Sequence, residues 1–251
     1  MPSNLDLRNC DNMEVMAQFP DKYFELAIVD IEYNIGASKP SIKPSVVKQK
    51  NGSILHVKQP NYTPKDWDYK QSSQQYFDEL FRVSKNQIIW GANYYGFAGG
   101  MIIWDKLNGE NDQMGCEIAY CSLNQRCDIV YYLWSGMMQG VYCGKDIRKA
   151  LIQQGNKKLN EKRIHVTQKP VALYKWLLQN YAKQGDKILD THLGSASIAI
   201  ACYDLGFDLT GCELDKDYFD AAMKRIENHK KQKVIQFPEP NTFIPIQHKL
   251  F

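Results

Sequence analysis

Two carboxylates follow a short apolar run near the start of the chain, in the stretch ELAIVDIEYNIG (residues 25–36). The run LAIV is typical of a buried strand, and Asp30 and Glu32 stand where such a strand would end. Acids at that position either carry chemistry or mark an ordinary exit into a loop. Tyr33 and Gly36 follow closely and favour chemistry, but the stretch alone does not decide.

A second unit with chemical potential is KILDTHLGSASIAIACYDLGFDLTGCELD, residues 187–215. It reads as strand, small-residue turn, helix, strand and terminal acid, which is the order of a βαβ ligand site. Gly194, Ser195 and Ala196 would let the backbone approach a ligand closely. Glu213, about twenty residues further on, stands where a carboxylate can accept both hydroxyls of an adenosine ribose. The unit predicts a nucleoside-containing cofactor.

The phosphate-binding turns of other nucleotide sites are absent from the sequence. A dinucleotide would require the fuller Gly-x-Gly-x-x-Gly turn, and a nucleoside triphosphate would require Gly-Lys-Ser/Thr. S-adenosylmethionine has no phosphate, so a single glycine with small neighbours, and Asp190 at the strand end, are enough for it. We therefore expect S-adenosylmethionine.

A sheet must position these residues, and strand-like runs alternate with amphipathic helical segments along the chain. The alternation predicts an α/β fold with helices on both faces of the sheet. Strands are expected at 25–30, 86–91, 101–105, 127–134, 187–190 and 208–215. Helices are expected at 74–84, 170–182, 197–206 and 217–229, with a C-terminal glycine at 206 and a possible cap at Asp215.

Bulk composition sets limits on the class of protein. With 251 residues, 44% of them hydrophobic, the chain can form one large domain or a domain with an insertion. No run approaches the roughly 18 apolar residues of a membrane span, and no secretory signal is visible, so we expect a cytoplasmic protein. Seven scattered cysteines without a Cys-x-x-Cys pair indicate reduced, mostly buried thiols and no metal.

Lysine is unevenly distributed, although the net charge is only +3. Residues 39–66 and 144–169 concentrate lysine together with Gly, Pro, Asn, Ser or Gln, and both predict mobile surface loops or insertions. Such segments are usually only solvated surface. Because both flank strands with candidate chemistry, they favour a phosphate backbone as partner.

The residues of the motifs and their order along the chain resemble a known family. HVTQKPVALYKWLL and GDKILDTHLGSASIAIACYDLGFDLTGCELD, with FELAIVDIEYNIG far upstream, are similar to the amino-methylating DNA methyltransferases of the permuted β class. There the catalytic Asp-Pro-Pro-Tyr motif comes first, and the Thr-x-Lys-Pro and Asp-Pro-Phe-x-Gly-Ser-Gly cofactor motifs come last. The resemblance covers roughly residues 3–229. It implies a Rossmann-like seven-stranded sheet, S-adenosylmethionine, and methylation of adenine N6 or cytosine N4.

The resemblance assigns catalytic roles to the residues from Asp30 to Tyr33. Asp30 and the carbonyl of Ile31 would accept the two hydrogens of an exocyclic amine, and Tyr33 would stack on a base flipped from double-stranded DNA. Hydrogen bonds that favour a pyramidal nitrogen free its lone pair for in-line attack on the sulfonium methyl. Because the motif ends in tyrosine, adenine N6 is the expected target.

Both motifs depart from the family pattern. Ile31 and Glu32 replace two prolines, which would stiffen the loop, and Glu32 adds a charge beside the pocket. Thr191 and His192 stand where the family has Pro-Phe. Ala196 stands for the second glycine, a mild change at negative φ and a costly one at positive φ. Restoring the two prolines is expected to raise turnover.

Further residues are assigned by their neighbourhood. The expected cofactor contacts are Thr167, Gln168, Lys169, Asp190, His192, Gly194, Ser195, Ala196, Ser197, Glu213 and Leu214. The expected DNA contacts are Asn34, Lys39, Lys48, Lys50, Trp67, Asn93, Tyr94, Lys157, Lys158 and Arg163. His165 and His192 are expected to be positional, since direct transfer to an amine needs no strong general base.

The expected organisation is a single methyltransferase domain over residues 1–235, with a basic insertion at 37–72, a target-recognition region at about 107–165 and an irregular tail at 236–251. The resemblance implies a bacterial or phage-encoded restriction-modification enzyme, acting alone, as a homodimer or with a related methyltransferase subunit. Two alternatives stay open. One is a catalytically impaired homologue that serves as a DNA-binding or partner subunit, and the other is an RNA or protein N-methyltransferase.

Overall fold

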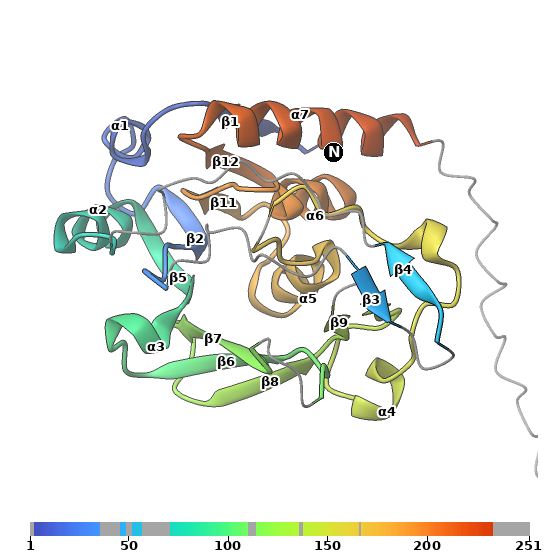
Figure 1. Cartoon of the computed structure of the whole chain (residues 1–251). Coiled ribbons are helices and arrows are strands. Elements are labelled where there is room, and N and C mark those ends of the chain that lie inside the picture. Colours follow the sequence, from blue (N-terminus) through green and yellow to red (C-terminus); the bar gives the residue numbers. More distant parts are fainter. Residues whose placement is uncertain are drawn as a thin grey trace, which may run out of the picture.

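The computed structural model describes residues 3–35, 46–48, 52–56, 71–109, 114–135, 138–165 and 167–232 (Figure 1). Several predicted features lie outside these residues, namely Gly36, Lys39, Lys50, Trp67, the side chains of Lys48 and Lys157, and the tail 236–251. Within the described ranges, no helix has the length and apolarity to cross a bilayer.

Within the described residues, the central sheet has eight strands in the order β1-β12-β11-β2-β5-β7-β6-β8. These are β1 (Leu5–Arg8), β2 (Phe24–Asp30), β5 (Ser84–Trp90), β6 (Gly100–Asp105), β7 (Cys116–Cys121), β8 (Cys127–Tyr131), β11 (Lys187–Asp190) and β12 (Asp208–Cys212). β7 runs antiparallel to β5 and β6, whereas the other neighbours are parallel. The predicted α/β fold is confirmed, although the sheet has eight strands instead of seven, with β8 at one edge.

Two short hairpins form separate two-stranded sheets. β3 (Val46–Lys48) pairs with β4 (Ile54–His56) inside the predicted basic insertion, and β9 (Trp134–Ser135) pairs with β10 (Met138–Gln139). Both hairpins are antiparallel.

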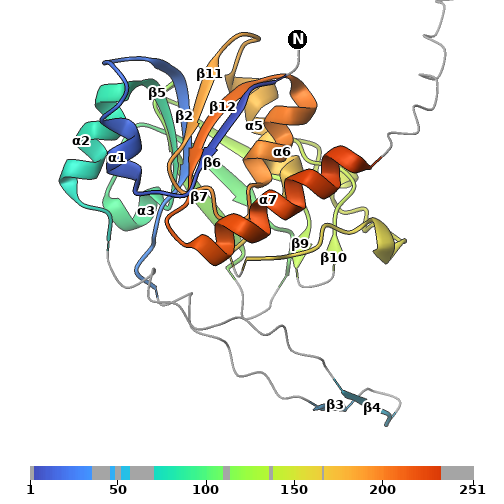
Figure 2. The same ribbon diagram turned by 90° about the horizontal axis from the view of Figure 1, so that it is seen from above.

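Helices cover both faces of the sheet (Figure 2). α1 (Asn12–Met16), α2 (Gln74–Val83) and α3 (Ala92–Tyr95) lie on one side, and α5 (Val171–Tyr181), α6 (Ser197–Leu205) and α7 (Lys216–Lys231) lie on the other. α4 (Ile147–Ala150) and a 3-10 turn (Lys157–Leu159) belong to the segment between β10 and α5. The four predicted helices are confirmed. Asp215 caps α7, and α6 ends at Gly206 with φ of 75°, both as predicted.

Strand β2 shows why its sequence is a continuous apolar run. Leu26 and Ile28 pack into the core beneath α5 and α6, whereas Ala27 and Val29 pack into the core beneath α1 and α2. Because side chains alternate along a strand and both faces of the sheet are covered, every position from 26 to 29 must be apolar. Asp30 is the first polar position and ends the strand, while Ile31 after it is still buried in the core beneath α1 and α2.

The sheet order brings distant segments of the chain to one edge. β2 and β11 are parallel neighbours, so Asp30 and Asp190 end the two strands at the same edge. β1, the first strand of the chain, pairs with β12 in the register Leu5 to Leu209. The loops that follow β1, β12, β11, β2 and β5 consequently all open at this edge, which is where ligands bind in such sheets.

Two expectations about individual residues are wrong. The lysine-rich segment 144–169 does not remain a surface loop to its end, because Gln168 and Lys169 are only 5% and 3% exposed. Of the seven cysteines, three are buried, two are half-buried and two are exposed, so most are not buried. All seven are free thiols.

Candidate active site

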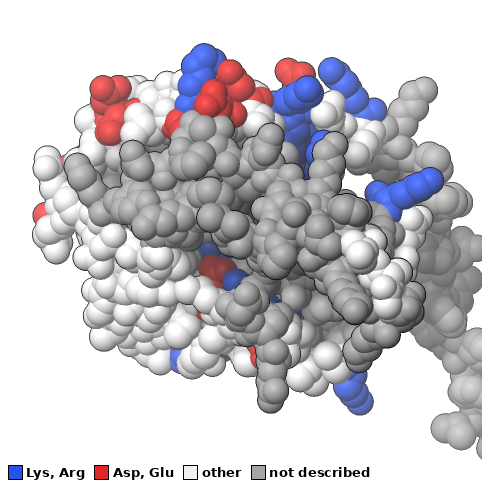
Figure 3. All heavy atoms as spheres, viewed as in Figure 1, with Lys and Arg blue, Asp and Glu red and all other residues white. Residues whose placement is uncertain are grey.

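A cavity of about 690 Å³ lies at the edge where the strand ends meet. Asp30 at the end of β2 and Tyr33 in the loop that follows line it from one side, and His192 and Gly194 line it from the loop after β11. Figure 3 shows a hollow near the centre of this face, with both acidic and basic atoms inside. The motifs that the sequence placed far apart therefore share one cavity.

Four charged side chains form a network at the β2 end of the cavity. Lys169 forms an ion pair with Asp30, and its Nζ also lies 2.8 Å from Oε2 of Glu117. Lys106 Nζ lies 2.6 Å from the other Glu117 oxygen. The Lys169 side chain is only 2% exposed, and a buried charge requires a partner of opposite sign. Two cations thus balance two carboxylates.

This network shifts the protonation equilibria of its members. Burial alone would lower the pKa of Lys169, but the carboxylates of Asp30 and Glu117 outweigh it, so that pKa is raised. Burial alone would raise the pKa of Glu117, but Lys169 and Lys106 outweigh it and lower that pKa to about 2. Burial raises the pKa of Asp30, and Lys169 opposes this rise. Lys169 is therefore the cation on which both acids depend.

Tyr33 links the network to a neighbouring cavity. Its hydroxyl lies 2.9 Å from Oδ1 of Asp30 and 3.1 Å from Oε2 of Glu117. Its ring stacks on Tyr94 with centroids 5.0 Å apart, and it also packs against Gly91, where an added Cβ would stand 2.3 Å from Cε1 of Tyr33. Gly91, with φ of 83°, is therefore required both by its backbone and by this close approach.

The β11 end of the cavity is held by backbone hydrogen bonds to carboxylates. Gly194 N–H donates to Oε2 of Glu213 at 2.8 Å, and Asp215 N–H donates to the other Glu213 oxygen at 2.9 Å. His192 N–H donates to Oδ1 of Asp190 at 2.9 Å. Each carboxylate oxygen can accept more than one hydrogen bond, so Glu213 keeps acceptor capacity for ligand hydroxyls.

Ala196 occupies a strained position at the start of α6. Its φ is 58° and its ψ is 32°, in the left-handed region that favours glycine, and Gly194 has a φ of 50°. Ala196 stands where the family has its second glycine, and its positive φ makes this replacement the costly one of the two cases considered from the sequence.

Asp190 lies under the same loop and is 2% exposed. Burial raises its pKa from 3.8 to about 7, while the N–H and the positive charge of His192 oppose the rise. A carboxyl group that titrates near neutrality at the bottom of a cavity is typical of a functional site.

Arg225 supports the glycine loop from behind. Its guanidinium donates to the Ser195 carbonyl at 2.7 Å and to Ser197 Oγ at 2.9 Å, and it pairs with Glu161 at 2.9 Å. Glu161 in turn accepts the Val171 N–H at the start of α5, which has no side-chain cap of its own. Sequence reasoning missed both Arg225 and Glu161, because neither belongs to a motif.

The segment before α5 lines the cavity, but its members differ in orientation. The Lys169 side chain points toward the β2 end, and its carbonyl accepts from Ser197 Oγ at 2.7 Å. Gln168 is buried, and its Oε1 accepts the Ile164 N–H at 2.9 Å. Thr167 is exposed and contacts His165, and burial lowers the pKa of that histidine to about 4. Lys169, a predicted cofactor contact, lines the cavity, and its charge lies beside Asp30.

The residues predicted to contact DNA fall into two groups. Asn93 and Tyr94 line a second cavity of about 700 Å³, which shares Tyr33 and Glu117 with the first. Arg163 lines the first cavity above the ring of Trp134, 4.4 Å from its centroid. Of the remaining predicted residues that the structure describes with their side chains, Asn34 and Lys158 line neither cavity: Asn34 follows Tyr33 with φ of 55°, and Lys158 is exposed. Leu214, a predicted cofactor contact, is 71% exposed at the first cavity.

The chain belongs to the family of DNA methylases that act on N6 or N4 amines, because the family model described as DNA methylase matches residues 32–224. This is a family of S-adenosylmethionine-dependent methyltransferases. The resemblance predicted from the sequence is therefore confirmed at the level of the family.

Individual relatives match only part of their length. The Type II methyltransferase M.HpaI of Haemophilus parainfluenzae is 33% identical over 64 residues, which are 26% of this chain and 20% of that protein. M2.DpnII of Streptococcus pneumoniae is 36% identical over 63 residues, 25% of this chain and 24% of that protein. The structure of M1.HpyAVI in complex with SAM matches with a TM-score of 0.52 at 16% identity, over 88% of this chain and 99% of that one, and shows a shared fold.

Proposed function

We propose that this protein transfers a methyl group from S-adenosylmethionine to the exocyclic amine of a base in double-stranded DNA, with adenine N6 as the target. The observation that carries this proposal is that Asp30 and Gly194, on separate strand-end loops, line one cavity. An acceptor for amine hydrogens and a loop that suits a nucleoside thus face the same space.

The residues of the β11 end fit the cofactor. Glu213 can accept the ribose hydroxyls, and the backbone at Gly194 can approach the ligand, while a volume of about 690 Å³ lies within the range of small-molecule sites. When bound there, S-adenosylmethionine supplies an electrophilic methyl group on a positively charged sulfur. Asp190 and the segment at Thr167 and Gln168 are the candidates for its amino acid portion.

The residues of the β2 end act on the target amine. Asp30 and the Ile31 carbonyl would accept its two hydrogens, which frees the nitrogen lone pair for attack. Lys169 stabilises the ionised form of Asp30, because its ammonium group is buried against that carboxylate. The charged network is in place before the substrate arrives, so little reorganisation is needed during the reaction.

Tyr33 and Tyr94 are positioned to receive the base. Tyr33 lines both cavities and stacks on Tyr94, which lines the second, so a flipped base would contact Tyr33 as it reaches Asp30. The choice of adenine rests on the tyrosine that ends the motif. We propose a single domain over residues 1–235, in which the insertion 37–72 and residues 107–165 contact the duplex.

Transfer of tritiated methyl groups to unmethylated duplex DNA, followed by nucleoside analysis, tests the proposal. We expect N6-methyladenine, and we expect Asp30→Asn to lower the transfer rate about 100-fold or more with S-adenosylmethionine affinity unchanged within about threefold. Lys85→Met is the control, because it removes an exposed ion pair with Glu25 at the amino end of the strands.

Each other outcome identifies an alternative. N4-methylcytosine would retain the enzyme class and correct the target base. Calorimetric binding of S-adenosylmethionine without transfer to any substrate would contradict the proposal in favour of a partner subunit. Transfer to RNA or protein alone would contradict the choice of DNA.

A further inference from the structure

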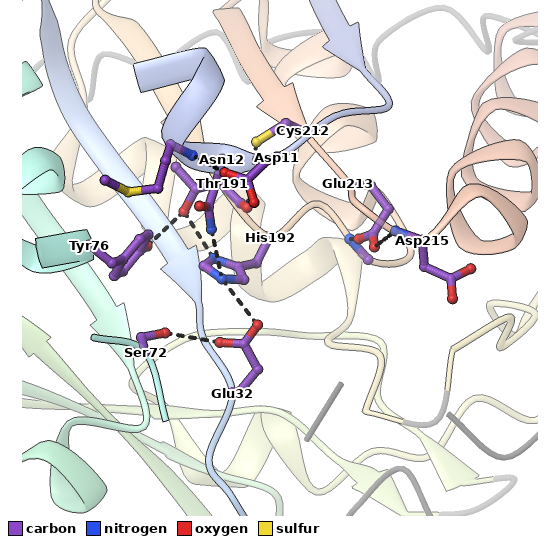
Figure 4. A network of polar contacts seen from close by, with 12 residues as sticks. Asp11, Asn12, Glu32, Ser72, Tyr76, Thr191, His192, Cys212, Glu213 and Asp215 are labelled. Carbon is purple, nitrogen blue, oxygen red and sulfur yellow. Dashed lines mark hydrogen bonds and ion pairs between the residues drawn. The ribbon is translucent and has the colours of Figure 1, made fainter. Parts of the chain in front are cut away.

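Two of the residues that depart from the family motifs meet in the structure. Glu32 stands on the loop after β2, where the family has proline, and His192 stands on the loop after β11, where the family has phenylalanine. Glu32 Oε1 lies 3.4 Å from His192 Nε2, with side chains 25% and 15% exposed (Figure 4). The two substitutions therefore form a contact between the two halves of the site.

Glu32 also accepts hydrogen bonds from two other segments. Its second carboxylate oxygen accepts from Ser72 Oγ at 2.9 Å, and its carbonyl accepts from the Tyr95 hydroxyl at 2.5 Å. Ser72 N–H also donates to that tyrosine hydroxyl, at 3.0 Å. The end of the insertion and helix α3 thus converge on Glu32, one residue before Tyr33.

His192 also has polar contacts on its own side of the cavity. Its Nδ1 lies 2.9 Å from Thr191 Oγ1, which lies 2.7 Å from the Tyr76 hydroxyl, and its Nε2 lies 3.4 Å from Asn12 Nδ2. Figure 4 shows the ring between these groups and Glu32. A protonated ring can donate from Nδ1 to Thr191 and from Nε2 to Glu32, which uses both nitrogens. The Asn12 amide nitrogen is itself a donor, so it can bond Nε2 only when that nitrogen carries no proton.

We propose that the Glu32–His192 ion pair positions the Asp30–Tyr33 loop relative to the cofactor loop, and so supplies the rigidity that two prolines would otherwise provide. This inference rests on the proposed function. Glu32 and His192 act as positioning residues, since the reacting groups are assigned to Asp30 and to the cofactor. The pair also makes the relative geometry of the two loops depend on two charges.

The protonation equilibria agree with an ion pair at neutral pH. Burial alone would lower the pKa of His192, but Glu32, with smaller contributions from Asp190 and Glu213, raises it from 6.5 to about 9. Burial alone would raise the pKa of Glu32, but His192 lowers it from 4.5 to about 2. The stabilisation is complete between about pH 4.5 and 6.5, falls as the pH rises through 9, and falls as it drops through 2.

This contact changes the expected result of restoring the prolines. Ile31→Pro with Glu32→Pro would remove the carboxylate that His192 faces and leave a buried imidazole between Thr191 and Asn12. We now expect that double variant to lose turnover, and the triple variant that adds His192→Phe to recover it.

The first test does not depend on catalysis. The His192 ring is titrated by NMR in the wild-type protein and in Glu32→Gln, which retains an acceptor for Ser72. We expect the His192 pKa to fall by about one unit or more, a tenfold loss of proton affinity, and hydrogen exchange at residues 31–35 to accelerate about tenfold. An unchanged His192 pKa, or unchanged exchange, would overturn the proposal.

The second test measures coupling. Glu32→Gln and His192→Phe are each expected to lower kcat about tenfold with KM values unchanged within about threefold, and the combined variant is expected to be no slower than either. Losses that multiply in the combined variant would show independent roles and refute the pair. The wild-type kcat should also fall as the pH rises through 9, and the combined variant should lack this fall.

The matched control is His229→Gln, which breaks another histidine–carboxylate pair, 2.6 Å from Asp204 and remote from the cavity. It should leave kcat and the exchange of residues 31–35 unchanged. If the wild-type chain methylates no substrate, the proposed function fails, while the titration and exchange experiments still decide the role of the pair.

Discussion

The two ends of the cavity are built from different interactions. At the β2 end, Asp30, Glu117 and two lysines neutralise one another through side-chain contacts. At the β11 end, backbone N–H groups donate to the carboxylates of Glu213 and Asp190. A side-chain network fails when one member is removed, because a buried charge then lacks its partner. A backbone-held loop keeps its conformation when its side chains other than His192 are replaced, as long as the acceptors remain.

The largest effect is expected from Lys169→Met, which breaks the network at its centre. Asp30 and Glu117 would then share a buried site with only Lys106, so the free energy of unfolding should fall by about 3–5 kcal/mol and kcat by about 100-fold or more. Urea denaturation at pH 7 measures the first quantity. The control is Lys85→Met, which removes an exposed ion pair and should lower the free energy of unfolding by less than about 1 kcal/mol. Equal losses of unfolding free energy in Lys169→Met and Lys85→Met would contradict the central role of Lys169. Lys169→Arg keeps the charge, so it should lose less stability and less activity than Lys169→Met.

A smaller effect on the free energy of unfolding, a gain instead of a loss, is expected from Asp190→Asn at the β11 end of the cavity. Because the pKa of Asp190 rises from 3.8 to about 7 on folding, the native protein binds this proton more tightly than the unfolded chain, and stability falls as the pH rises across that interval. The variant lacks this loss. It should be more stable than wild type by roughly 2–4 kcal/mol at pH 8 and should show no gain at pH 4.

Urea denaturation across this pH range checks that prediction. The amide oxygen that this substitution introduces could still accept the His192 N–H, so the loop should persist, while affinity for S-adenosylmethionine is expected to decrease. Parallel stability curves for the two proteins would show that Asp190 does not titrate on folding.

The smallest effect is expected from Ala196→Gly. Glycine adopts the left-handed conformation without strain, which should raise the free energy of unfolding by about 1–2 kcal/mol, whereas loss of a buried methyl group lowers it by about 0.8 kcal/mol. The net gain in stability should therefore not exceed about 1 kcal/mol. Thermal unfolding of this variant and of Gly194→Ala gives a matched pair. At Gly194 an added Cβ meets only the His192 carbonyl, at 3.8 Å, so that substitution should destabilise through backbone strain alone. A stabilising Gly194→Ala would invalidate the assignment of strain.

Periodicity predicted the elements that have long or fully buried patterns. The runs at β2, β5 and β11 are apolar because both faces of the sheet are covered. β1 and β7 were not predicted: LDLR is short and half-buried throughout, and CEIAYC mixes polar and apolar residues near the edge of the parallel region. Helix α1, with five residues, is too short for a helical pattern to be recognised.

The site was predictable where its residues follow one another in a motif. Asp30 and Tyr33, and Gly194 with Glu213, could be identified because a strand end and a small-residue turn each have a recognisable local sequence pattern. Glu117, Glu161 and Arg225 could not, since their roles arise only when strands and helices far apart in sequence come together. Lys169 was found within a motif, but its ion pair joins it to Asp30, far upstream in the chain, and has no local signature.

The pairing of β1 with β12 has a consequence for synthesis of the protein. Leu5 leaves the ribosome about 200 residues before its partner Leu209, so β1 cannot pair with β12 until that later strand is translated. The wall of the cavity formed by Asn12 and Glu213 can close only after that event. A nascent chain therefore carries the loop after β2 long before the wall of the cavity that faces it can form.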